Sequence, residues 1–217
     1  MIVVSGMPRS GSSLMMQTLK HLGVPLIGED SYNFEGNSYL HSQDISDEDQ
    51  ERITKHNPWG YYDIPFEEHR NYTHNPHNGE AIKILGPVLI SFIPNENIER
   101  VLLCERRDKD AQATSYENLA KLDVEVMDKE ISDGRMDPSS VRARSIEIYR
   151  TMNFKDYRRL VNFGQLSIQR WWRDRNIKFM TCFYEDMLET SELSIREIQN
   201  FLGLQGPRDK AIENIRK

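Results

Sequence analysis

The fold is decided by residues 2–13, which read IVVSGMPRSGSS. The apolar run Ile2–Ser5 predicts a short buried strand of a parallel sheet. Beyond the glycine-containing turn, apolar side chains recur at helical spacing, which predicts a helix over Ser12–Leu22 that stops at Gly23. A strand, a tight glycine turn and a helix therefore open the chain.

Strands and helices alternate through the rest of the sequence. Further strands are predicted over Ala81–Leu85, Arg100–Cys104 and Ile177–Phe183, and helices over Asp110–Leu122, Ser139–Met152, Asp156–Arg175 and Glu192–Leu202. This alternation predicts the α/β class, as a single domain over residues 1–217 with a central parallel sheet of about four or five strands flanked by helices.

Composition narrows the range of functions. The 217 residues include 28 Lys and Arg against 34 Asp and Glu, a net charge of −6 that argues against nucleic acid as a partner. Two cysteines, Cys104 and Cys182, lie in apolar runs and are interpreted as buried thiols. Residues 84–94 form the longest apolar run, too short for a membrane span, and no basic leader precedes Ile2. We expect a cytoplasmic protein.

The glycine turn has the spacing of a phosphate-binding P-loop. Four residues separate Gly6 from Gly11, which allows backbone N–H groups and the helix N-terminus to face an anion. An ATP-binding loop would carry a lysine where Ser12 stands, whereas this loop carries its cation three residues earlier, at Arg9.

This loop resembles the 5′-phosphosulfate loop of sulfotransferases that use 3′-phosphoadenosine 5′-phosphosulfate (PAPS). Those enzymes carry Pro, Lys or Arg, Ser, Gly and two hydroxyl residues, as Pro8–Ser13 do here. The resemblance implies that the 5′-phosphate binds Ser10, Gly11, Ser12 and Ser13. It also implies that Arg9 neutralises the oxygen of the leaving group.

A second segment of the same family binds the 3′-phosphate with an arginine at a strand end and a serine eight positions later. Arg107 and Ser115 have this separation, and we prefer them. Arg106 and Thr114 have the same separation, so the register stays open.

Two more segments extend the resemblance along the chain. Phe183–Met187 is similar to the Tyr-Glu-Asp strand end of the family, which implies that Tyr184 lies near the nucleotide. Residues 57–63 and the strand that carries Lys83 match compact bacterial members, and Lys83 is expected to reach the sulfuryl oxygens.

The general base departs from the pattern of small-molecule sulfotransferases. Leu85 stands where those enzymes carry a histidine. Counting from Arg9, the glutamates of tyrosylprotein sulfotransferases fall on Glu29 and Asp30, so we expect Asp30, with Glu29 second, to take the acceptor's proton.

The resemblance implies transfer of the sulfuryl group from PAPS, without a metal, to a hydroxyl acceptor, or to an amine as the second choice. The acceptor-binding or lid regions are expected in residues 30–79 and 139–175. The alternatives are a P-loop kinase and a nucleotide-binding protein without catalysis. No motif indicates the acceptor or the oligomeric state.

Replacing the expected base tests this assignment. Asp30→Asn keeps the shape and removes the proton acceptor, so kcat should fall by about 10²–10⁴ while PAPS affinity changes little. Glu29→Gln should have a smaller effect in the same steady-state assay. Near-wild-type turnover in both variants would place the base elsewhere, with His56 and Asp63 the next residues to replace.

Overall fold

The computed structural model describes residues 1–27, 79–87, 94–134, 137–139 and 141–216. These residues form two compact units. The first comprises Met1–Arg107 and Gly164–Lys217, and the second comprises Asp108–Phe163.

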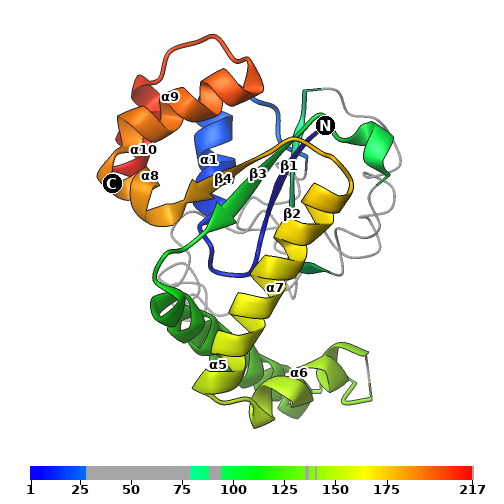
Figure 1. Cartoon of the computed structure of the whole chain (residues 1–217). Helices are drawn as coiled ribbons and strands as arrows, with labels where there is room; N and C mark the ends of the chain where they lie inside the picture. Colours follow the sequence, from blue (N-terminus) through cyan, green and yellow to red (C-terminus); the bar gives the residue numbers. More distant parts are fainter. Residues whose placement is uncertain (28–78, 88–93, 135–136, 140, 217) are drawn as a thin grey trace. The chain divides into compact units, whose positions relative to one another are not determined.

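The first unit is built on a four-stranded parallel sheet (Figure 1). The strands are β1 (Ile2–Gly6), β2 (Ala81–Leu85), β3 (Arg100–Glu105) and β4 (Phe179–Phe183). Their order in the sheet is β2-β1-β3-β4, so β1 and β3 are central. Because all neighbours are parallel, every strand ends at the same edge, and the segments that follow β1, β3 and β4 leave the sheet close together.

Helices cover both faces of this sheet (Figure 1). The unit contains α1 (Ser12–His21), the 3-10 turn η3 (Asn95–Asn97), α8 (Tyr184–Glu189), α9 (Ser191–Leu202), α10 (Asp209–Ile215) and the second part of α7 (Phe154–Asp174). Alternate strand residues face opposite sides: Leu102 packs with α1, α9 and α10, whereas Leu103 packs with Ile168 and Trp172 of α7. Both faces of the sheet are therefore apolar and buried.

The second unit is helical. It contains α5 (Lys109–Ser132), α6 (Val141–Thr151) and the first part of α7. The side chain of Asp108 caps α5 by accepting a hydrogen bond from the N–H of Ala111 at 2.8 Å. Tyr116 packs edge to face on both Tyr149 and Tyr157, with ring centroids 6.4 and 5.4 Å away, and these rings form much of its small core.

The predicted α/β class with a parallel sheet flanked by helices is confirmed, and the predicted strands are all present. The predicted end of a helix at Leu122 is wrong, because α5 continues to Ser132. The short helices α8 and α10 were not predicted, since six or seven residues show too little periodicity. In the described part of the chain, no helix combines the length and apolarity that crossing a membrane requires.

The two cysteines occupy paired positions on β3 and β4, and both are buried and free. Burial raises the pKa of Cys104 to about 12 and that of Cys182 well above its ordinary value. Because the thiolate is the reactive form, neither should react with an aromatic disulfide reagent in the native protein at about pH 8. Both should react once guanidinium unfolds the chain. Rapid labelling of the native protein would contradict this burial.

Candidate active site

The loop between β1 and α1 presents the N-terminus of a helix to its surroundings. Gly11 caps α1 with a φ of 92°, and Arg9 also adopts a left-handed conformation, with a φ of 64°. No side chain caps the helix, and its first turn contains no acidic residue. The first N–H groups of a helix have no acceptor within it and carry partial positive charge, so this loop favours an anion.

The loop is packed closely against its neighbours. A Cβ atom at Gly6 would lie 2.6 Å from the carbonyl oxygen of Cys104 and 2.6 Å from the hydroxyl of Ser10. On the other side, α7 approaches Met7 at Gly164, where a Cβ would lie 2.2 Å from the methionine sulfur. Glycine at these two positions allows the loop to fit between β3 and α7.

Lys83 brings a buried positive charge to the same loop. It lies on β2 in register with Val4 of β1, and its side chain is only 2% exposed. Its Nζ donates a hydrogen bond to Ser13 Oγ at 3.4 Å. A buried ammonium beside a helix N-terminus stabilises negative charge placed between them.

Tyr184 and Arg106 extend the site away from the loop. Tyr184 begins α8 and packs on Gly11, where a Cβ would lie 2.7 Å from the ring atom Cδ2. The guanidinium carbon of Arg106 lies 4.1 Å from the centroid of that ring. Arg106 Nε is buried and has no hydrogen-bond acceptor among the described residues. A buried arginine N–H without an acceptor is a candidate hydrogen-bond donor to a ligand.

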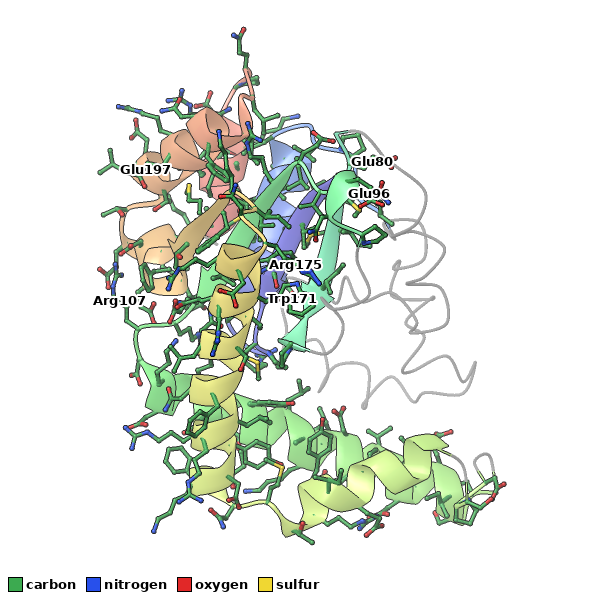
Figure 2. All side chains as sticks on the ribbon, turned by 45° about the vertical axis from the view of Figure 1, so that its right-hand side comes forward. Glu80, Glu96, Arg107, Trp171, Arg175 and Glu197 are labelled. Atoms are coloured by element: carbon green, nitrogen blue, oxygen red, sulfur yellow. The ribbon has the colours of Figure 1, made fainter. Side chains whose placement is uncertain are left out.

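Arg107, labelled in Figure 2, has different partners from Arg106. Its Nη2 donates to Asp186 Oδ2 at 2.7 Å, and its Nη1 donates to Oδ1 of the same carboxylate. The pair lowers the pKa of Asp186, mainly through these hydrogen bonds, and raises that of Arg107. The guanidinium also lies over Phe183, 4.2 Å from the ring centroid.

The structure thus brings together several of the residues predicted from sequence: the loop Arg9–Ser13, Lys83 and Tyr184. It does not bring Arg107 to them through a described contact. Ser115 lies in the second unit and is half-buried. Glu29 and Asp30 lie outside the described residues. Leu85, which stands where the resembled small-molecule enzymes carry a histidine, is the last residue of β2.

Sequence reasoning assigned no role to Asp186, Gln165 or Gln169. Gln165 is buried and donates to the Cys104 carbonyl at 3.5 Å, and Gln169 donates to Glu105 at 3.0 Å. Asp186 could have been found from strand register: Glu105 pairs with Phe183, so the arginines after β3 face the acidic residues after β4.

Among the described residues, no group of three or more His, Cys, Asp or Glu side chains could hold a metal ion.

One comparison with known proteins identifies a family for the whole chain. A family model described as "Sulfotransferase domain" matches residues 1–217. A search of curated proteins found no match. Among solved structures, a crystal structure of retinol dehydratase in complex with androsterone and the inactive cofactor PAP is similar, with a TM-score of 0.47 and 16% identity. The alignment covers 99% of this chain and 63% of that one.

The close packing at Gly6 predicts that a larger residue at this position destabilises the protein. Gly6→Ala places a methyl group against the backbone of Cys104, which cannot move without disturbing the pairing of β1 with β3. We expect the free energy of unfolding to fall by about 1–3 kcal/mol in urea titrations. Gly206→Ala is the matched control, because nothing lies within 4 Å of its Cβ position. Equal stability of the two variants would contradict the packing described.

Proposed function

Because the chain belongs to the sulfotransferase domain family, we propose that it transfers the sulfuryl group of PAPS to the hydroxyl group of an acceptor. The other product is 3′-phosphoadenosine 5′-phosphate, PAP. The observation that carries the proposal is the uncapped N-terminus of α1 with buried Lys83 beside it. The buried Nε–H of Arg106, which has no acceptor among the described residues, suits a donor that carries a further phosphate.

The loop and its cations would supply most of the catalysis. In the transfer, the acceptor oxygen forms a bond to sulfur while the bond from sulfur to the bridging phosphate oxygen breaks. Backbone N–H groups of Gly11, Ser12 and Ser13 would hold the 5′-phosphate. Ser10, whose N–H donates to the Met7 carbonyl at 3.2 Å, would contribute its hydroxyl. Arg9 would neutralise the departing oxygen, and Lys83 would bind the sulfuryl oxygens. Fixed donors aimed at developing charge are a large source of rate enhancement.

Of the two registers that the arginine–hydroxyl spacing allows, we assign the 3′-phosphate to the one that begins at Arg106 rather than at Arg107. Two observations support this register. Arg106 stacks on Tyr184, which in turn packs on the loop, and its buried Nε–H has no acceptor among the described residues. Arg107, in contrast, binds a carboxylate with both of its terminal nitrogens.

The remaining assignments rest on sequence. Asp30, with Glu29 second, would accept the proton of the acceptor, and residues 30–79 and 139–175 would form the acceptor pocket. The family match over residues 1–217 supports a single domain to which both compact units contribute. The free buried cysteines support a reducing, cytoplasmic location.

The 3′-phosphate assignment has a direct test. Arg106→Gln removes a charge-assisted contact of about 1.5–3 kcal/mol, so affinity for PAP should fall about 10- to 150-fold. Affinity for 5′-AMP, which lacks the 3′-phosphate, should change much less in the same calorimetric titrations. Arg196→Gln, an exposed arginine of α9 paired with Glu192, is the matched control and should leave both affinities unchanged. If the Arg106→Gln variant keeps the wild-type preference for PAP over 5′-AMP, Arg106 is not the ligand of the 3′-phosphate.

Turnover separates the proposal from its alternatives. The protein should convert PAPS to PAP in the presence of EDTA when given a panel of alcohols and phenols, and mass spectrometry should find sulfate on one of them. Transfer of phosphate from ATP with Mg²⁺ would indicate a kinase. Tight binding of PAPS with no transfer to any acceptor would indicate a nucleotide-binding protein.

A further inference from the structure

Three contacts join the segments that follow β3 and β4. None of them involves Arg106 or Tyr184, the two residues of these segments that are proposed to bind the nucleotide. Glu105 and Phe183 are the last paired residues of the two strands. Immediately beyond them, the backbone N–H of Arg107 donates to Glu185 Oε2 at 3.1 Å. The Arg107 guanidinium lies over Phe183 and binds Asp186 with two hydrogen bonds.

The partners in these contacts lie next to, or two residues from, the two residues proposed to bind the nucleotide, Arg106 and Tyr184. Arg106 precedes Arg107, Tyr184 lies between Phe183 and Glu185, and Asp186 follows Glu185. The contacts therefore hold the two backbones that carry Arg106 and Tyr184. We propose that the Arg107–Asp186 pair is a clamp that sets the stacking of Arg106 on Tyr184, and the packing of Tyr184 on the phosphate loop, residues 6–13. Arg107 and Asp186 are then positioning residues, and the proposal rests on the proposed function for its choice of nucleotide probe.

The geometry of the pair suits positioning better than general stability. The two side chains are 51% and 39% exposed, and exposed ion pairs add little to the free energy of unfolding because water and salt screen them. A two-pronged bond between guanidinium and carboxylate nevertheless fixes the relative orientation of its two groups. The Phe183 ring restricts the arginine further.

The clamp predicts how variants discriminate between nucleotides. Asp186→Asn and Arg107→Gln should each weaken binding of PAP and of 5′-AMP by the same factor, about two- to thirtyfold, because Tyr184 is misplaced for both. The KM for PAPS should rise by a larger factor than kcat falls, since neither Arg9 nor Lys83 is replaced. The double variant should be no worse than either single variant, and Arg107→Lys should restore part of the loss.

A matched control lies in the second unit. Arg150 binds Asp128 with the same two-pronged geometry on an exposed surface, so Asp128→Asn should leave both affinities at wild-type values. The clamp is overturned if Asp186→Asn keeps or tightens PAP binding. It is also overturned if Arg107→Gln weakens PAP selectively, because Arg107 would then be the phosphate ligand.

A second readout needs no nucleotide and separates this proposal from the proposed function. In hydrogen–deuterium exchange, Asp186→Asn should speed exchange in residues 7–15 and 184–189, while Asp128→Asn should not. If the wild-type protein bound neither PAP nor 5′-AMP, the proposed function would be wrong. The hydrogen–deuterium exchange of Asp186→Asn would then show by itself whether the clamp orders these segments. Unchanged exchange in Asp186→Asn would overturn it.

Discussion

The parallel register of β1, β3 and β4 is the constraint on which the site depends. Gly6 pairs with Cys104, and Cys104 pairs with Cys182, so the three strands end together. The residues that come next are therefore neighbours in space although they are far apart in sequence. This places the phosphate loop beside Tyr184, and Tyr184 beside Arg106. Close contacts at Gly6 and Gly11 leave no room for a side chain at either position.

Positive charge is concentrated locally in a chain that is acidic overall, with a net charge of −6. The N-terminus of α1 has no acidic side chain in its first turn, and Lys83 is buried against it. Acidic residues are instead directed to Arg107, through Glu185 and Asp186. The two arginines are adjacent in the sequence but have different partners: Arg107 binds Asp186, whereas Arg106 stacks on Tyr184.

Sequence patterns were sufficient for the sheet and the loop, because buried strands are apolar runs and a phosphate loop needs glycines at a defined spacing. They were insufficient for α8 and α10, which are too short to show a helical period. Spacing alone also could not decide which arginine binds the 3′-phosphate, because Arg106 and Thr114 are separated by the same eight positions as Arg107 and Ser115. Only the contacts with Tyr184 and Asp186 distinguish the two arginines. Glu29 and Asp30 stay predictions, because they lie outside the described residues.

A crystal structure with PAP bound would show which residues hold the two phosphates. We expect the 5′-phosphate on the backbone N–H groups of the phosphate loop and the 3′-phosphate within hydrogen-bond distance of Arg106. Arg107 should still be bound to Asp186 in that structure. A nucleotide bound away from the loop would contradict the proposed site, and so would a 3′-phosphate that draws Arg107 away from Asp186.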